Sequence, residues 1–211
     1  MSEENLLVID TSAGLTTPKE EVAEPLPVYD ENLPMLSAPI PDYDIRKLPN
    51  PLMTKLINRM KLTKDIFNGI GLSANQCGVF ERVFVIGVGE NSWACINPKI
   101  VAKAPSTIKD TEGCLSFPGL GLKIDRPEWI EAEFYNENGE LVQMRMEGLT
   151  ARCFQHELDH MNGVLYTHRA KPLALQMAMK RRAKLSEKRR RLQKQLMTKV
   201  KNVTKQLARI R

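Results

Sequence analysis

Residues 151–166 read ARCFQHELDHMNGVLY and place two histidines four positions apart, His156 and His160, with Glu157 directly after the first. On an α-helix, four residues advance about 400° and roughly 6 Å, so both imidazoles project from one face. Two imidazoles at that spacing can hold one metal ion, with Glu157 beside it as a proton acceptor. The pattern is typical of metal-assisted hydrolases, in which the metal lowers the pKa of a bound water. Such a site needs a third protein ligand.

A third ligand is first sought downstream, where metzincin proteases continue the pattern as His-Glu-x-x-His-x-x-Gly-x-x-His. The chain follows this pattern as far as Gly163, but its last position is Tyr166. His168 is the only other histidine in the sequence, and it lies two residues too late. A metzincin-like metalloprotease is therefore an alternative that lacks its third imidazole.

Upstream, residues 111–119 read TEGCLSFPG and offer the thiol of Cys114. A thiolate is a good ligand for iron, zinc, nickel or cobalt, and three protein ligands leave a fourth position for water. The alternative is that Cys114 is a small buried side chain, as free cysteines often are.

A third segment, residues 68–79, reads NGIGLSANQCGV. It lacks the third glycine of the dinucleotide fingerprint and the Gly-Lys-Ser/Thr of a P-loop, so a nucleotide site is not indicated. Glycines allow a backbone to approach a substrate closely, and Gln76 adds an amide donor that can face a developing oxyanion.

Together, these segments resemble peptide deformylase, a family of hydrolases that remove the formyl group from the initiator methionine of nascent chains. The family signatures Gly-x-Gly-Leu-Ala-Ala-x-Gln, Glu-Gly-Cys-Leu-Ser and Gln-His-Glu-x-Asp-His correspond here to GIGLSANQ (69–76), EGCLS (112–116) and QHELDH (155–160). Ser73 replaces the first alanine, a change expected to leave the site intact. The resemblance covers about residues 26–170, and Phe-Pro-Gly at 117–119 is similar to the plant-organelle and cyanobacterial branch.

The resemblance implies a chemical role for each motif. One divalent metal ion, Fe(II) first and zinc, nickel or cobalt as alternatives, would be bound by Cys114, His156 and His160. Glu157 would take a proton from the attacking water and pass it to the departing amine. The side chain of Gln76 and the backbone amide of Leu115 would steady the oxyanion.

The substrate of such an enzyme would be a formyl-methionyl nascent peptide. By resemblance, the Gly71 backbone would align this peptide, and the methionine pocket would be lined by Ile70, Leu149 and Cys153. For Ile70 and Leu149, ordinary core packing is an alternative, since an apolar pocket is a part of the core left open.

Four charged residues lie in or near the motifs: Glu112, Arg126, Arg152 and Asp159. Ligating histidines usually donate their other ring N–H to an oxygen acceptor, but the sequence leaves open which acid serves which group. We predict that Asp159→Asn lowers metal retention more than it lowers protein stability.

Length and composition fit this interpretation. With 211 residues and 42% hydrophobic content, the chain can form one domain with a core. No apolar run approaches 18 residues, so no transmembrane segment is expected. The start, MSEENLLVID, resembles neither a secretory signal nor an Arg-rich transit peptide. The four cysteines contain no Cys-x-x-Cys pair, which favours a reducing compartment. These features predict a cytoplasmic protein, with a mature organellar form as the alternative.

The chain is expected to divide into a flexible acidic segment (1–25), a catalytic domain (26–170) and a basic helical tail (171–211). The proline-rich first 51 residues should be irregular. The hydrophobic pattern predicts a helix at 51–67, a strand at 81–89, a hairpin at 129–147 turning at Asn138-Gly139, and the metal helix at 148–165. The fold class is therefore α+β, with antiparallel strands packed around a central metal-binding helix, which is also the deformylase fold.

The tail carries its own signal. Residues 169–211 hold 16 lysines and arginines against one acid, Glu187, and after Pro172 there is no proline or glycine. Leucine, valine and isoleucine at steps of three, four or seven predict a long basic amphipathic helix (Leu185, Leu192, Leu196, Val203, Leu207 and Ile210). Such a helix suits a phosphate backbone, and the absence of interleaved aromatic residues gives no indication of base stacking.

Some deformylases dock on the ribosome through a C-terminal helix, so the resemblance implies contact between residues 172–211 and ribosomal RNA; DNA binding is not expected. The alternatives for this helix are a merely solvated helix, a seam for a partner helix, and an anionic membrane surface. A further alternative is an RNA- or ribosome-binding protein on an inactive deformylase scaffold, which the intact motif residues argue against.

Overall fold

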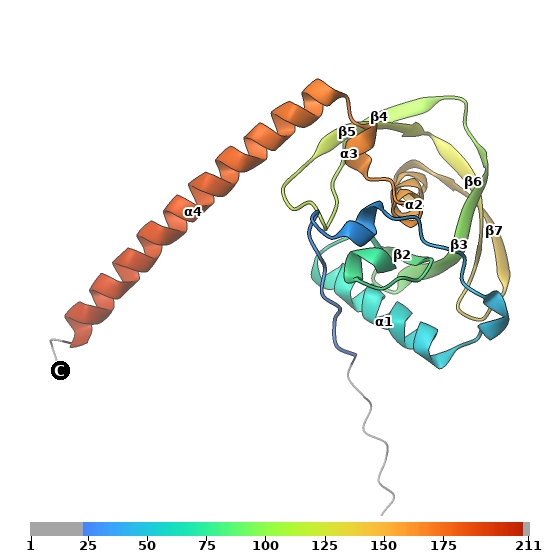
Figure 1. Ribbon diagram of the computed structural model, residues 1–211, viewed down its shortest axis with the longest axis horizontal. Helices are drawn as coiled ribbons and strands as arrows, with labels where there is room; N and C mark the ends of the chain where they lie inside the picture. The colour runs from blue at the N-terminus through green and yellow to red at the C-terminus, as the bar shows by residue number, and fades with distance from the viewer. Residues whose placement is uncertain (1–22, 209–211) are drawn as a thin grey trace, which may run out of the picture.

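One buried helix, α2 (Gly148–Met161), lies within a curved arrangement of antiparallel strands (Figure 1). This computed structural model describes residues 23–208, with side chains as far as Lys201. The expected flexible segment at 1–25 falls almost wholly outside the described residues. The α+β class predicted from the sequence is confirmed.

The larger sheet has five strands in the order β1 (Gly71–Ser73), β2 (Val83–Val88), β3 (Asn91–Lys103), β6 (Trp129–Tyr135) and β7 (Leu141–Glu147). A second sheet pairs β4 (Thr107–Glu112) with β5 (Leu122–Pro127). The predicted strand at 81–89 is β2, and the predicted hairpin is β6–β7. In its turn, Gly139 has φ +83°, a conformation that L side chains rarely adopt. Side chains of β6 alternate between buried and half-buried, so the sheet presents one face to α2.

Helix α1 (Pro51–Ile66) confirms the helix predicted at 51–67. Its N-terminus is capped by the Asn50 side chain, which accepts a 2.9 Å hydrogen bond from the N–H of Leu52, and Pro51 occupies the first turn. The buried face of α1 packs on β1 and β2 and therefore supports the strand that leads into the site.

Helix α2 ends earlier than predicted. The sequence pattern indicated a helix over 148–165, but the last helical residue is Met161. Gly163 has φ +69°, and a Cβ atom there would lie 2.8 Å from the carbonyl oxygen of Ser37. The chain turns at this point because α3 (Tyr166–Arg169) packs into a different apolar cluster, beside Phe117 and Leu120.

The chain before α1 is irregular, as its prolines predict, with two short 3-10 helices, η1 (Pro34–Ser37) and η2 (Ile45–Lys47). It runs along the body and pairs with the end of α2 through a bridge between Pro39 and Asn162. The backbone N–H of Tyr29 donates to the carbonyl oxygen of Gln76, which holds this segment beside η3 (Ala74–Cys77).

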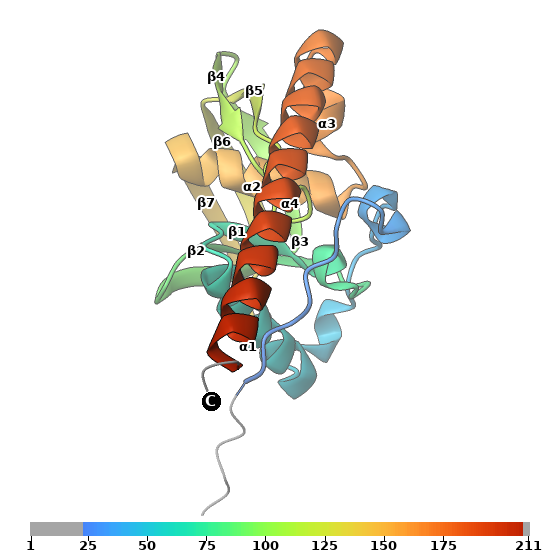
Figure 2. The same ribbon diagram turned by 90° about the vertical axis from the view of Figure 1, so that its left-hand side faces the viewer.

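The predicted tail helix is α4 (Pro172–Ala208), which diverges from the body towards its C-terminal end (Figure 1) and runs in front of the body in the view of Figure 2. Its first turns are anchored because Leu175 and Ala178 pack against the cluster around Phe117. Further along, Leu185, Leu192 and Leu196 are exposed, while Val203, Leu207 and Ile210 lie beyond the described side chains. Within residues 23–208, no helix has an apolar stretch long enough to cross a membrane.

Candidate active site

A cavity of about 670 Å³ opens where three segments meet: β1 with η3, the loop after β4, and α2. Nine of the residues indicated by the sequence line it: Ile70, Gly71, Gln76, Cys114, Leu115, Leu149, Cys153, His156 and Glu157. His160 does not line the cavity but is buried next to it. Segments separated by more than 80 residues are thus brought to one place.

The three candidate metal ligands converge at the inner edge of this cavity, where Cys114 and His156 line it and His160 is buried next to it. Single ligand atoms of Cys114, His156 and His160 all lie within 4.8 Å of one another, and the Cys114 Sγ is 3.3 Å from the His160 Nε2. The two imidazoles are one helical turn apart on α2, with ring centroids 5.1 Å apart. A thiol and two imidazoles held this closely, with the thiol half-buried, form a donor set that fits one divalent metal ion.

The metzincin alternative finds no support in this geometry. Tyr166, at the position of the third metzincin histidine, packs its ring 5.4 Å from that of His156 and donates from its hydroxyl to the carbonyl oxygen of Leu120. His168 is exposed on α3. The third donor comes instead from Cys114, on a separate loop.

Glu112, the last residue of β4, connects the metal ligands to a buried ion network. Its carboxylate lies 3.0 Å from the Nδ1 of His156 and accepts hydrogen bonds from Arg126 and Arg152 at 2.7–2.9 Å. Burial alone would raise the pKa of Glu112, but the hydrogen bonds with Arg126 and His156 hold it well below its ordinary value. Glu112 is therefore the acid that orients His156.

Asp159 serves a different group. It pairs with Arg126 at 2.6 Å and with Arg169, a residue that sequence reasoning did not single out. These contacts tie the end of α2 to α3 and to the network around Glu112. The Nδ1 of His160 has no hydrogen-bond partner among the described residues.

Glu157 is buried beside the two imidazoles and is held by β1. The hydroxyl of Ser73 donates a 2.8 Å hydrogen bond to its Oε2. A Cβ atom on Gly71 would collide with the Glu157 carboxylate and lie 2.7 Å from the Cys153 Sγ, so only glycine fits there. Burial raises the pKa of Glu157, and the nearby His156 and the Ser73 hydrogen bond oppose that rise.

Gln76 is fixed from both ends of its amide. Its Oε1 accepts a 2.9 Å hydrogen bond from the N–H of Ser73, and its Nε2 lies 3.3 Å from the Cys114 Sγ and 3.1 Å from the Ser116 Oγ. The amide donor therefore points at the metal-ligand cluster. Within the described residues, the backbone N–H of Leu115 donates to no other group.

The rim of the cavity is apolar. Ile70 is 38% and Leu149 is 62% exposed, so both stand at the cavity mouth rather than in the core, whereas Cys153 is buried and donates to the carbonyl oxygen of Ile70. Sequence reasoning missed five other residues that line the cavity: Val28, Tyr29, Asp30, Pro118 and Gly119. No local signal marks the N-terminal residues, because they reach the cavity only through the path of the chain.

An α+β fold that places a thiol, two imidazoles and a buried carboxylate at one open cavity defines a metallohydrolase. The sequence model of the polypeptide deformylase family matches residues 25–176. The chain belongs to this metal-dependent family.

Individual relatives agree with that assignment. The chain is 39% identical over 150 residues to peptide deformylase of Thermotoga maritima, covering 71% of this chain and 79% of the relative. The crystal structure of a Thermotoga maritima peptide deformylase superposes with a TM-score of 0.67 at 37% identity, over 71% of this chain and 99% of the other. A structure from Synechococcus elongatus in complex with actinonin gives a TM-score of 0.71 at 33% identity, over 82% of this chain and 94% of the other.

The protein is therefore a deformylase, a hydrolase that removes the N-formyl group from nascent polypeptides. The protease and inactive-scaffold alternatives are not favoured. The plant-organelle and cyanobacterial branch stays a prediction.

Proposed function

We propose that this deformylase binds one divalent metal ion through Cys114, His156 and His160, and that Fe(II) is the native ion. The observation that carries the proposal is the convergence of their ligand atoms within 4.8 Å, beside the buried carboxylate of Glu157. When bound, the metal supplies Lewis acidity: it lowers the pKa of a water molecule and polarises the formyl carbonyl. Zinc, nickel and cobalt are alternatives that this donor set also accepts.

The residues around the three metal ligands transfer the proton, orient Glu157 and stabilise the oxyanion. Glu157 accepts the proton of the attacking water and returns it to the departing amine nitrogen. Ser73 holds the Glu157 Oε2 at 2.8 Å, which keeps the carboxylate turned towards the cavity. The Nε2 of Gln76 and the N–H of Leu115 donate to the oxyanion that forms on the formyl group, each worth about 2.7–4 kcal/mol in other enzymes.

The substrate is positioned by the backbone of Gly71 and by the apolar rim. A formyl-methionyl peptide lies along Gly71, where the absence of a side chain permits close approach. Its methionine side chain packs against Ile70, Leu149 and Cys153, all of which line the cavity. The catalytic domain spans residues 26–170 and works in the cytoplasm.

Metal analysis tests the site directly. Protein purified without oxygen should carry about one metal equivalent, mostly iron, since three protein ligands complete one such site. His156→Ala should lose the metal, whereas His168→Ala, which alters an exposed histidine outside the cavity, should retain it. Equal metal in both variants would exclude the proposed ligands. Activity that survives air unchanged would exclude iron as the native metal.

The tail, residues 171–211, is proposed to contact ribosomal RNA. Support comes from its 15 lysines and arginines and from the way α4 stands away from the body (Figure 1). Because Leu175 and Ala178 belong to the core, the test should remove only residues 192–211. This truncation should abolish salt-sensitive co-sedimentation with ribosomes while leaving formate release intact. Unchanged sedimentation would leave the solvated-helix, partner-helix and membrane alternatives.

A further inference from the structure

A second groove, of about 600 Å³, lies next to the catalytic cavity, between α4 and the loop that follows Cys114. Asp30, Pro118 and Gly119 line both hollows. The groove is therefore continuous with the rim of the catalytic cavity. No residue of the three family signatures (69–76, 112–116 and 155–160) lines it.

One wall of this groove is a single face of α4, made by Met179, Arg182, Leu185, Ser186 and Arg189. The facing wall is the segment 30–32 together with Pro118 and Gly119. Arg182 fixes the spacing between the walls, because its guanidinium pairs with Glu31 at 2.5 Å and both side chains are largely shielded from solvent. With Leu175 and Ala178 packed in the core, the position of this wall is determined by the fold.

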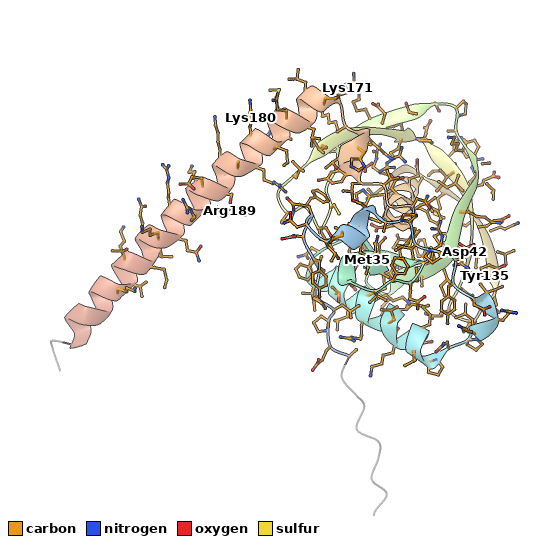
Figure 3. All side chains as sticks on the ribbon, in the orientation of Figure 1. Met35, Asp42, Tyr135, Lys171, Lys180 and Arg189 are labelled. Carbon is orange, nitrogen blue, oxygen red and sulfur yellow. The ribbon has the colours of Figure 1, made fainter. Side chains whose placement is uncertain are left out.

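The charges in the groove are unequally satisfied. Arg182 is neutralised by Glu31, whereas Asp30 at the shared rim accepts a hydrogen bond from the N–H of Asn32 and makes no ion pair among the described residues. Arg189 makes no ion pair within the described part of the chain. It lies seven residues beyond Arg182, about 10 Å further along the helix axis, on a part of α4 that stands clear of the body in Figure 3. The groove thus has apolar contacts from Met179 and Leu185 and an unpaired cation at its far end.

The occupant must be compatible with these features. A second copy of α4 would bring like charges together, since the helix is strongly basic. A polypeptide substrate, in contrast, has to leave the catalytic cavity across some part of its rim. An extended chain advances about 3.3 Å per residue, so the eight residues after a formyl-methionine span about 26 Å. Because Asp30, Pro118 and Gly119 line both hollows, such a chain can continue from the cavity into the groove.

We propose that the groove between α4 and the Pro118–Gly119 loop binds the downstream residues of the formylated polypeptide, and that Arg189 favours chains with acidic side chains there. This inference rests on the proposed function of the adjoining cavity. It makes α4 part of the substrate site as well as a basic tail.

The test uses full-length Ni(II)-loaded protein and three formylated peptides: formyl-Met-Ala-Ser, and two nonapeptides that extend it with either glutamates or lysines at the last four positions. The kcat/KM of the glutamate peptide should exceed that of the lysine peptide by about two- to fivefold, the size expected for a solvent-exposed ion pair. For each protein variant, the kcat/KM of formyl-Met-Ala-Ser is the reference with which the values of the two nonapeptides are compared.

Matched variants on α4 decide whether the groove is responsible. Arg189→Glu should reverse the preference for the glutamate peptide. Arg190→Glu makes the same charge change at a neighbouring residue outside the groove, paired with Glu187, and should leave the preference as in the wild type. Ser186→Trp places a large side chain in the groove. The kcat/KM of both nonapeptides should then fall to that of the tripeptide.

Binding of the same labelled peptides by the Glu157→Gln protein, followed by fluorescence anisotropy, should show the same order of affinities. Equal binding of the two nonapeptides, or the same effect of Arg189→Glu and Arg190→Glu, would overturn the proposal. If no peptide, the tripeptide included, released formate, the result would contradict the proposed catalytic site and not the groove. The binding measurement would still decide on the groove.

Discussion

The hydroxyl of Ser73 lies 2.8 Å from the Oε2 of Glu157, and both side chains are buried. Ser73 belongs to the glycine-rich motif and Glu157 to the metal helix, so this hydrogen bond joins two motifs that are 84 residues apart. The N–H of the same serine donates to the amide oxygen of Gln76. One residue therefore positions both the proposed proton acceptor and the proposed oxyanion donor.

Ser73→Ala should lower kcat about two- to tenfold with little change in KM, because one buried hydrogen bond that orients Glu157 is lost. Steady-state kinetics on a formyl-Met tripeptide measure this split. Ser106→Ala, at an exposed serine outside the cavity, is the control. A kcat equal to that of the wild type would mean that Glu157 is held by other contacts.

Gly71→Ala should reduce kcat/KM about a hundredfold, since the new Cβ atom would displace the Glu157 carboxylate or the Cys153 thiol, and a misplacement of about 1 Å can cost that much. The matched control is Gly121→Ala, whose Cβ atom would meet Thr111 Cγ2 at an ordinary 3.4 Å. Thermal unfolding of both variants separates a displaced site from a misfolded protein. Similar activity in the two variants would contradict the close approach at Gly71.

Glu112→Gln should weaken metal binding about ten- to hundredfold, because Glu112 is the carboxylate in contact with the His156 ring. Competition with a chelator measures the affinity. The sequence-based prediction for Asp159→Asn, a greater loss of metal than of stability, stays open, but the ion pairs of Asp159 are with Arg126 and Arg169. We therefore expect Asp159→Asn to lose less metal than Glu112→Gln. A greater loss in Asp159→Asn would refute the assignment of Glu112 as the acid that orients His156.

Three of the four cysteines should be unreactive in the folded protein. Burial raises the pKa of the Cys77 thiol from 9.0 to about 12, and it raises those of Cys95 and Cys153 well above the ordinary value. At pH 8, a disulfide reagent should modify only Cys114 in native protein stripped of metal. More than one rapidly reacting thiol would contradict this burial.

The same thiols should make stability depend on alkaline pH. Their folded-state pKa values are raised, so their contribution to stability is complete below pH 9 and is lost as the pH rises towards about 12. Urea unfolding between pH 8 and pH 10 should show a falling free energy of unfolding. Cys77→Ala should make that fall less steep, and an unchanged slope would exclude Cys77 as a contributor.

The sequence predicted those parts of the fold in which pattern and motif coincide. Helix α1 has its Asn-Pro start, and the β6–β7 hairpin has its Asn-Gly turn. Strand β4 was missed because five of its six residues are exposed and show no alternation. Strand β3 was missed because Pro98 and two register shifts interrupt its pattern.

In the candidate site, too, some residues could be predicted from the sequence and others could not. The motif residues were predictable because metal ligands need fixed spacings, as His156 and His160 show. The contacts of Ser73, the choice of Glu112 over Asp159, and the N-terminal rim at Tyr29 depend on how distant segments pack. No local pattern encodes such contacts.

The central claim is best tested by formate release from formyl-Met-Ala-Ser, using protein prepared without oxygen and loaded with Fe(II) or Ni(II), beside its Glu157→Gln variant. We predict release by the wild type and a loss of about a hundredfold to ten-thousandfold in a variant that still binds one metal ion. Release by the variant at the wild-type rate, or none from the fully metallated wild type, would contradict the proposed catalytic site.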